Sequence, residues 1–178
     1  MKVSKNYYYG EGFWDEKDPP VSDEIVKNAE CKLGIKFPKE YIELLKKSNG
    51  GTLHFKKVYI NRYGKCEIPY LLGIDLENAN EDDNEGIFSF SEDIKEFSLP
   101  EKIVILAWET YPHSCFALDY TNCTENPAVV YFYENYPEDN VPYSKAIVAP
   151  TFKEFLPLLY HQSTLKPSQL KTSWKRKS

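Results

Sequence analysis

Nineteen residues from Leu33 to Gly51 constrain the fold of this chain more than any other segment. They read Leu-Gly-Ile-Lys-Phe-Pro-Lys-Glu-Tyr-Ile-Glu-Leu-Leu-Lys-Lys-Ser-Asn-Gly-Gly. Gly34 suits the left-handed conformation that ends a helix, and Pro38 suits the first position of a following helix, where its missing N–H costs nothing. Asn-Gly-Gly at 49–51 then ends that second helix. The segment therefore predicts two consecutive helices and a turn into a strand.

Both helices carry further local signals. Ser22 is a good N-cap for the first, and Val21 is placed to pack against Val26 as a hydrophobic staple. The four-residue spacing of Ile25, Ala29 and Leu33 predicts its buried face. In the second helix, near 38–48, one stripe is predicted to face the core: Tyr41, Leu44, Leu45 and Ser48.

From Thr52 onwards the pattern changes to short β-rich runs, which predict antiparallel strands. We expect them at 53–55, 58–62, 68–74, 103–108, 114–120, 128–133 and 146–149, with 103–108 central in the sheet because it is wholly apolar. Ser91 is predicted to cap a short helix carrying Ile94 and Phe97. Thr151 and Glu154 predict a capping box for a last helix, whose buried stripe is Phe152, Phe155, Leu156 and Leu159.

The 33–51 segment resembles the SUKH superfamily, which includes the Smi/Knr cell-wall regulators and many bacterial immunity proteins. The order of the segments 103–108, 115–120, 126–131 and 151–156 is similar to that family's strands and closing helix. The likeness spans roughly residues 21–160. It implies a single-domain α+β fold, a mostly antiparallel sheet with helices packed around it, and a non-catalytic protein-binding module.

Length and composition agree with one domain, because 178 residues with 42% hydrophobic content are enough for one core and few for two. We divide the chain into an aromatic N-terminal arm at 1–20, a SUKH domain at 21–162 and a basic tail at 163–178. The tail is expected to be disordered, since it is polar and holds Pro167. The arm is expected to pack on the domain.

Charge and cysteine content indicate the compartment and the class of partner. Through Tyr160 the chain has 17 basic and 27 acidic residues, a formal charge of −10, which favours a basic partner and disfavours nucleic acid. No apolar run approaches membrane-span length, and the start lacks a secretory pattern. Four cysteines without C-x-x-C spacing suit a reducing compartment. We expect a cytoplasmic protein without membrane association, metal or cofactor.

Catalytic patterns are scarce in this sequence. It lacks a glycine-rich phosphate loop, a G-x-S-x-G elbow and a His-Glu-x-x-His motif. Cys115 and His113 could share a strand face as a dyad, but Cys115 also fits a small buried hydrophobe. Glu109 and Asp119 flank the same hairpin and could act as acid and base, although surface solvation explains them equally well. We therefore expect no enzyme.

An acidic cluster occupies the predicted loop at 75–87. Solvation alone accounts for such a loop, whereas binding to a Lys/Arg surface is the functional alternative and calcium a third, because the spacing misses the EF-hand template. We predict that a partner is bound by residues of this loop and of the 103–120 hairpin, namely Glu81, Asp82, Asp83, Glu85, Trp108, Glu109, Tyr111, Asp119 and Tyr120.

The resemblance implies a function as well as a fold. The expectation is a cytosolic immunity protein that occludes the active cleft of a cognate polymorphic toxin, possibly a nuclease, encoded nearby. A regulatory scaffold of the Smi/Knr type is the alternative, and a small hydrolase or ligand-binding enzyme is a more remote one. Exposed tyrosines or strand edges could equally form a homodimer, so monomer and homodimer both stay open.

Overall fold

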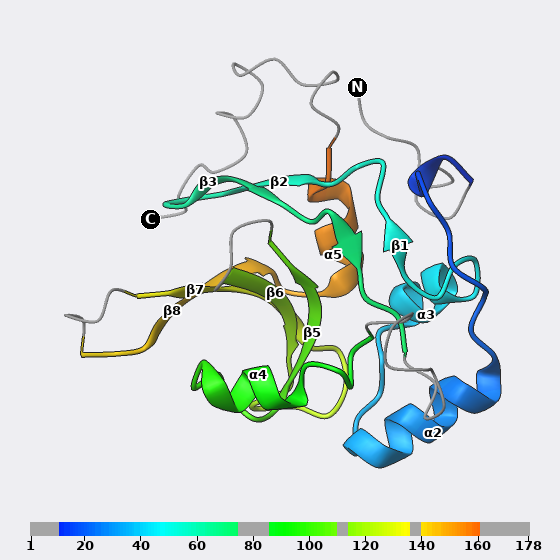
Figure 1. Cartoon of the computed structure of the whole chain (residues 1–178), viewed down its shortest axis with the longest axis horizontal. Coiled ribbons are helices and arrows are strands. Elements are labelled where there is room, and N and C mark those ends of the chain that lie inside the picture. The colour runs from blue at the N-terminus through cyan, green and yellow to red at the C-terminus, as the bar shows by residue number, and fades with distance from the viewer. Residues whose placement is uncertain (1–10, 75–85, 110–113, 136–139, 161–178) are drawn as a thin grey trace.

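A computed structural model describes residues 11–74, 86–109, 114–135 and 140–160, and these ranges form the fold shown in Figure 1. The helical elements are η1 (Glu11–Phe13), α2 (Asp23–Leu33), α3 (Lys39–Leu45), α4 (Ser91–Glu96), α5 (Phe152–Phe155) and η2 (Leu156–Leu158). The strands are β1 (Gly51–Thr52), β2 (Lys57–Ile60), β3 (Gly64–Glu67), β4 (Tyr70–Leu71), β5 (Ile103–Trp108), β6 (Ser114–Asp119), β7 (Ala128–Glu134) and β8 (Tyr143–Ala149). The predicted α+β class is confirmed.

The main sheet has the order β5-β6-β7-β8, and every neighbouring pair is antiparallel. The prediction that 103–108 lies centrally is therefore wrong, because β5 is the first strand of that order. β5 is apolar for a different reason. Other segments cover it, and the Leu72 N–H donates to the Leu106 carbonyl at 2.8 Å on its outer side. Two smaller pairs, β1 with β4 and β2 with β3, complete the β structure.

Helix α2 begins and ends as its sequence predicts. The Ser22 hydroxyl accepts the Ile25 N–H at 3.3 Å, and Gly34 adopts the left-handed conformation with φ 67°. Its buried face is different from the predicted one: Leu33 is 37% exposed. Val26, Ala29 and Glu30 are the buried residues of the helix. The spacing of hydrophobic residues did not reveal the true buried face, because one of its residues, Glu30, carries a carboxylate.

Glu30 closes the connection between α2 and α3. Its carboxylate accepts the Phe37 N–H at 3.0 Å and pairs with Lys36 Nζ at 2.5 Å. Pro38 then serves as the N-cap of α3 and not as its first residue. Tyr41, Leu44, Leu45 and Ser48 are all 0% exposed, which confirms the predicted stripe. Both helices therefore pack on the core, α2 through Val26 and Ala29 and α3 through this stripe.

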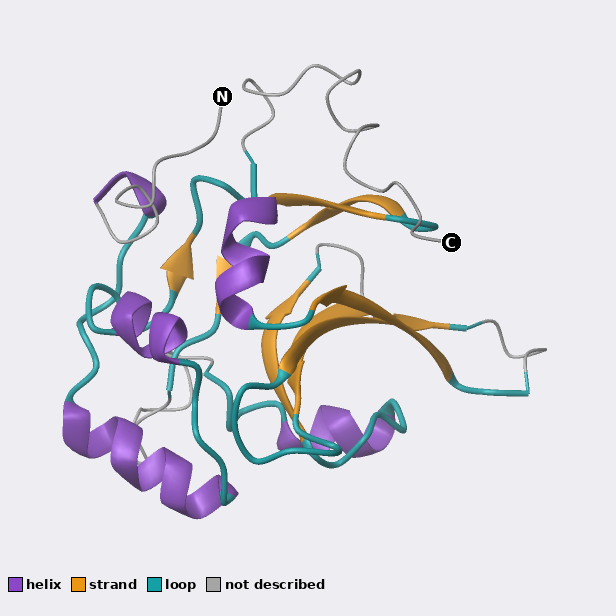
Figure 2. Cartoon of the chain, turned by 180° about the vertical axis from the view of Figure 1, so that it is seen from behind, coloured by secondary structure: helices purple, strands orange, loops and turns teal. Residues whose placement is uncertain are grey.

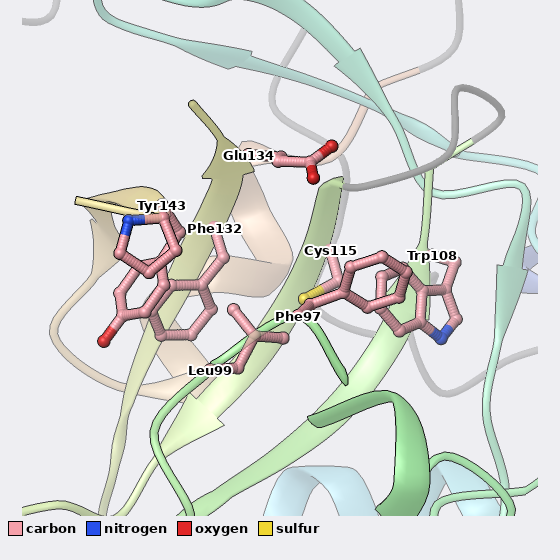
Figure 3. Close-up of a pocket in the computed structure, with 8 residues that line it drawn as sticks. Phe97, Leu99, Trp108, Cys115, Phe132, Glu134 and Tyr143 are labelled. Atoms are coloured by element: carbon pink, nitrogen blue, oxygen red, sulfur yellow. The ribbon is translucent and has the colours of Figure 1, made fainter. Parts of the chain in front are cut away.

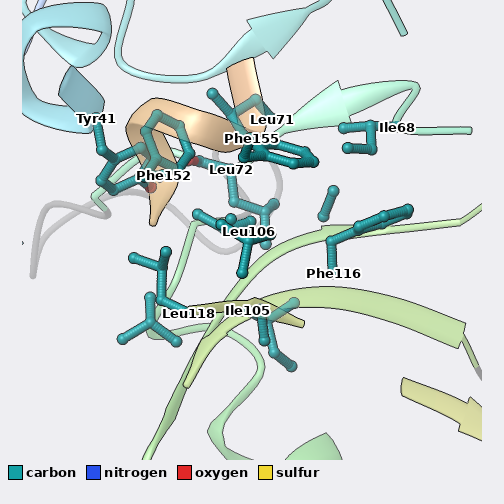
Figure 4. Close-up of a cluster of buried hydrophobic side chains, with 14 of the residues drawn as sticks. Tyr41, Ile68, Leu71, Leu72, Ile105, Leu106, Phe116, Leu118, Phe152 and Phe155 are labelled. Atoms are coloured by element: carbon teal, nitrogen blue, oxygen red, sulfur yellow. Dashed lines mark hydrogen bonds between the residues drawn. The ribbon is translucent and has the colours of Figure 1, made fainter. Parts of the chain in front are cut away.

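The main core lies between the sheet and the helices α3 and α5 (Figure 4). Phe152 packs against Tyr41 at 5.4 Å between ring centroids and against Phe155 at 5.9 Å. The Tyr41 hydroxyl donates to the Leu72 carbonyl at 2.7 Å, so a polar contact fixes α3 to the segment beside β5. The predicted stripe of the last helix is confirmed, because its four members are all buried: Phe152, Phe155, Leu156 and Leu159.

The part of the N-terminal arm that the structure describes packs on the domain. Phe13 is 0% and Trp14 6% exposed, and both belong to the main hydrophobic core. The His54 N–H donates to the Phe13 carbonyl at 3.0 Å, and Trp14 pairs with Leu53 as a β-bridge. Residues 1–10 and the tail at 163–178 lie outside the described residues.

The two faces of the main sheet have different coverings, which Figure 2 shows from behind. α5 and the β2–β3 hairpin lie over one face, and α4 lies over the other (Figures 1 and 2). The short helix predicted with Ile94 and Phe97 is present, since α4 carries Ile94 and Phe97 follows it directly. α4 is short, and the exposed residues of the sheet on its side lie towards the β8 edge.

Candidate protein-binding surface

The face of the sheet beneath α4 can be traced through its strand pairing. Trp108 pairs with Cys115, Cys115 with Phe132, and Phe132 with Lys145. Directly paired residues point to the same face, and so do residues two apart on one strand. Glu134, Tyr143 and Ile147 therefore share the face of Phe132 and Lys145. We call this side of the sheet the α4 face.

Burial decreases across the α4 face towards β8. Cys115 and Phe132 are 1% exposed, whereas Ile147 is 68% exposed. Val141, in the turn before β8, is 56% exposed. β8 is the last strand in the order of the main sheet, so within the described ranges this face has no strand beyond it. The β8 edge of this face therefore exposes Ile147 beside the Lys145 side chain.

A shallow hollow lies between α4 and the β7–β8 end of this face (Figure 3). It holds about 230 Å³ of space, part of it open solvent, and is lined by Phe97, Leu99, Trp108, Cys115, Phe132, Glu134, Pro142 and Tyr143. Phe132 and Tyr143 meet edge-to-face at 5.3 Å. The enclosed part is only about 10 Å³, close to the room that one water molecule needs, so the hollow is a feature of the surface and not a small-molecule pocket.

Trp108 is the predicted contact residue that lies at this hollow. Its ring packs against Phe90 and Phe97, each at 5.7 Å between centroids. The side chain is half-buried, and its indole Nε1 is buried without a hydrogen-bond partner among the described residues. Trp108 therefore forms a wall between α4 and the sheet, with part of its ring accessible.

Glu109 has a structural role in the described fold. Its carboxylate accepts the Tyr131 hydroxyl at 2.6 Å and the Glu67 N–H at 2.9 Å, which joins the hairpin end of β5 to β7 and β3. Burial and this hydrogen bond to Glu109 raise the pKa of the Tyr131 hydroxyl above its ordinary value. Glu67 is in turn paired with Lys56 at 3.4 Å and Lys57 at 3.2 Å.

Asp119 lies at the opposite end of the β5–β6 hairpin. It pairs in register with Ile103, while Glu109 lies beyond Trp108, so about 17 Å of strand separates the two carboxylates. Asp119 forms an ion pair with Lys145 and accepts the Thr121 hydroxyl at 2.6 Å. Burial raises the pKa of Asp119, but the hydrogen bonds from Lys145 and Thr121 outweigh it and hold the pKa below its ordinary value.

Tyr120 is a core residue. It is 2% exposed, and its hydroxyl donates to the Lys36 carbonyl at 2.9 Å, which connects β6 to the α2–α3 link. Burial raises the pKa of this hydroxyl. A side chain with so little exposure offers a partner no surface, and the sequence did not show this because its tyrosine ring suits a core and an interface equally well.

The geometry does not support the dyads considered from sequence. Cys115 is 1% exposed, and burial raises the pKa of its thiol to about 12, which keeps it in the unreactive protonated form. His113 lies outside the described residues. Glu109 and Asp119 are too far apart to act on one bond. Within the described ranges, His, Cys, Asp and Glu form no group of three suited to a metal ion.

Five of the predicted contact residues lie outside the described residues: Glu81, Asp82, Asp83, Glu85 and Tyr111. The residues that flank the acidic segment are well defined. Gly73 pairs with Gly86 as a parallel β-bridge, and the Ile87 N–H donates to the Gly73 carbonyl at 2.9 Å. Asn49 binds the Ile74 backbone next to it. The described residues on either side of the acidic segment, Gly73 and Gly86, therefore lie next to each other.

Sequence reasoning missed the exposed residues Glu134 of β7 and Ile147 of β8. The strands follow an alternating pattern, but alternation does not say which strand is at the edge of the sheet. The signal that could have found them is the charged and polar content of 134–145, which is unusual for an inner strand.

Comparison with known families supplies the remaining identification. The family model SUKH_6, described as SMI1-KNR4 cell-wall, matches residues 23–156. A search of curated proteins gave no match. Across the described part of the chain, no helix is both long and apolar enough to cross a membrane. The matched region contains every element from α2 to α5, and the chain therefore belongs to the SMI1-KNR4 family of the SUKH superfamily.

Proposed function

We propose that this protein is a cytoplasmic immunity protein that binds a cognate toxin, encoded nearby, and covers its active cleft. The observation that carries the proposal is the open part of the α4 face, where Ile147 is 68% exposed beside an aromatic hollow. Exposed apolar residues next to aromatic rings with a polar rim are characteristic of protein-binding surfaces. Membership of a family that includes immunity proteins supports the same function.

Charge supports a basic partner. The chain through Tyr160 has a formal charge of −10, and a field of this sign speeds association with a positively charged surface. A substrate groove that binds nucleic acid is such a surface. The toxin in this proposal is therefore a basic protein, with a nuclease as the leading candidate.

The acidic residues Glu81, Asp82, Asp83 and Glu85 belong to the proposed contact set together with the hollow. Gly73 and Gly86 hold the two ends of their segment together. The chain continues from Gly86 to Phe90, whose ring packs on Trp108. Tyr111 and Trp108 remain in the proposed set. Glu109 and Asp119 contribute through the shape of the surface, because their carboxylates are already bonded within the fold.

The test is co-purification of the tagged protein with the product of the adjacent gene, followed by growth rescue when that gene is expressed. A one-to-one complex with rescue is the expected result. I147E should weaken the complex at least about ten-fold, since it places a charge in an apolar contact. L158E is the matched control, because Leu158 is 40% exposed in η2, which follows α5 on the other side of the sheet.

A second candidate function has its own support in the family description, SMI1-KNR4 cell-wall. A regulatory scaffold of that type would act through several partners and would need no toxin neighbour. The same experiment separates the two functions. If the neighbouring product neither binds nor inhibits growth while several other proteins co-purify and are lost with I147E, the scaffold function replaces the immunity function.

A further inference from the structure

The main chain of β8 is bonded to β7 on one side only. At the turn end of this ladder the Asn135 N–H donates to the Pro142 carbonyl at 3.0 Å, so these two residues form a hydrogen-bonded pair. Hydrogen-bonded and non-hydrogen-bonded pairs alternate along an antiparallel ladder. Followed along the β7–β8 register, the alternation makes Ser144 and Ala146 the next residues of β8 that bond to β7.

Tyr143, Lys145 and Ile147 occupy the intervening positions of the register, so their N–H and C=O groups point away from β7. β8 is the last strand of the main sheet, and within the described ranges these groups have no hydrogen-bond partner on that side. Each residue supplies one strong donor and one strong acceptor. This edge of the sheet therefore presents a regular row of main-chain groups that another strand can bond.

The segment 143–147 has few of the features that protect an exposed edge against pairing. Such edges are commonly blocked by charged side chains, proline or a bulge. The segment contains no proline, and its one charged residue, Lys145, forms an ion pair with Asp119. The irregularity in the β7–β8 register comes only after Ile147, which is 68% exposed. The segment therefore keeps the features that allow a further strand to pair with it.

Charge distinguishes between a second copy of this chain and a different protein as the donor of that strand. The formal charge through Tyr160 is −10, so two copies repel each other while a basic protein is attracted. A symmetric pair of β8 strands centred on Lys145 would also place two lysines directly opposite each other, which is unfavourable. Both considerations favour a basic partner.

We propose that an extended segment of this basic partner adds to the main sheet as a fifth strand, bonded to the main chain of Tyr143, Lys145 and Ile147. In recognition by strand addition, main-chain bonds supply affinity and alternate side chains supply specificity. On the α4 face the added strand lies beside Ile147 and the stem of Lys145, so an apolar residue is expected there. The proposal rests on the proposed function, because it states how the toxin is held.

The test is residue-resolved hydrogen exchange, followed by NMR on the full chain alone and in complex with the product of the adjacent gene. In the free protein, the N–H groups of Ser144 and Ala146 should be protected by β7, while those of Tyr143, Lys145 and Ile147 exchange quickly. In the complex, exchange at these three should slow at least about ten-fold, because each donor gains a bond. Fast exchange at all three in the complex would overturn the proposal.

A proline substitution gives the second measurement. K145P removes the outward N–H of residue 145 without removing a hydrogen bond to β7, and proline is tolerated at such edge positions. K145A is the matched control, since both variants lose the Lys145 side chain and its ion pair with Asp119. The dissociation constant of the complex should be at least about ten-fold higher for K145P than for K145A, with thermal unfolding used to verify that both are folded. Equal affinities of the two folded variants would contradict strand addition, and the exchange measurement decides if K145P does not fold.

The same measurements distinguish this proposal from the proposed function. If the neighbouring product binds and I147E weakens the complex while exchange at the edge is unchanged, strand addition is wrong and immunity stands. If that product does not bind, immunity is wrong, and the strand proposal, which names this product as the donor, is wrong with it. Slow exchange at Tyr143, Lys145 and Ile147 in the free protein that becomes fast on dilution would assign the edge to a second copy instead.

Discussion

Asn49 holds the backbone of Ile74 at two points: its side-chain oxygen accepts the Ile74 N–H, and its side-chain nitrogen donates to the Ile74 carbonyl, each at 2.8 Å. Ile74 is 1% exposed, so few other groups could replace these bonds. The Asn-Gly-Gly segment thereby does more than end a helix. It fixes the point at which the chain enters the acidic segment.

We expect N49A to lower the free energy of unfolding by about 2 kcal/mol, because two neutral hydrogen bonds to a buried backbone are lost. Urea unfolding followed by circular dichroism measures the change. N122A is the control, since Asn122 is exposed in the β6–β7 turn. A difference between the two variants of less than about 0.5 kcal/mol would contradict the anchoring role.

Gly73 is expected to tolerate no side chain. A Cβ at this position would lie 2.0 Å from the Asn49 carbonyl oxygen. G73A should therefore cost at least about 3 kcal/mol, because backbone atoms must move apart. G34A is the comparison. Its position has φ +67° and no heavy atom within 4 Å, so only conformational strain of about 1 kcal/mol is expected. Equal losses in thermal unfolding would show that the close packing of Gly73 on Asn49 is unimportant.

The cysteines should differ sharply in reactivity. Cys31 is exposed, whereas Cys66 and Cys115 are buried, and burial raises their thiol pKa values to about 11 and 12. In the folded protein at pH 8, alkylation of Cys66 and Cys115 should be at least about 100-fold slower than that of Cys31, because the thiolate is the reacting form. Mass spectrometry of peptides after timed labelling checks this. Rapid labelling of Cys115 without unfolding would revive a nucleophilic role.

Glu109 should prove important for stability. E109A removes the acceptor of the Tyr131 hydroxyl and of the Glu67 N–H, and we expect a loss of about 2–3 kcal/mol. E101A, at an exposed position just before β5, should change stability by less than about 0.5 kcal/mol. If E109A is as stable as E101A and yet fails to bind the partner, Glu109 is a direct contact after all.

The Asp119–Lys145 pair should stabilise the fold in a pH-dependent way. Because the folded-state pKa of Asp119 lies below the ordinary value of 3.8, the folded protein binds fewer protons there than the unfolded chain. The stabilisation is therefore fully present above that value and is lost as the pH falls below it. For a pair this close to the surface we expect about 1 kcal/mol. D119N should flatten the acid side of a stability–pH profile, and an unchanged acid limb would refute the assignment.

Local signals in the sequence predicted local structure well. Ser22 caps α2, Gly34 ends it with φ 67°, and Thr151 accepts the Glu154 N–H at 3.2 Å at the start of α5. These depend on a few neighbouring residues, and so a short sequence pattern contains them. The capping box differs from its predicted form in one hydrogen bond, the one that the Glu154 side chain makes. The Glu154 carboxylate accepts the Thr151 hydroxyl at 2.9 Å.

Properties that depend on distant contacts were less predictable. An apolar run shows that β5 is buried but not that it lies first in the sheet order, because burial can come from other segments as well as from neighbouring strands. Glu30 is buried because the α2–α3 link places the Phe37 N–H against its carboxylate, a contact that the spacing of hydrophobic residues does not predict. For the candidate site, Trp108 was predicted and lies at the hollow. Glu134 and Ile147 were missed, because only the complete sheet shows which strand ends it.

The parallel bridge between Gly73 and Gly86 has a consequence for how relatives of this protein could diversify. Since Gly73 and Gly86 are paired, an insertion between them lengthens a connection whose two ends are already close, and its main cost is the entropy of closing a longer segment. Each doubling of loop length costs only about 0.6 kcal/mol. New recognition sequences could thus be acquired there without redesign of the core, which is the freedom that a protein needs when its target changes quickly.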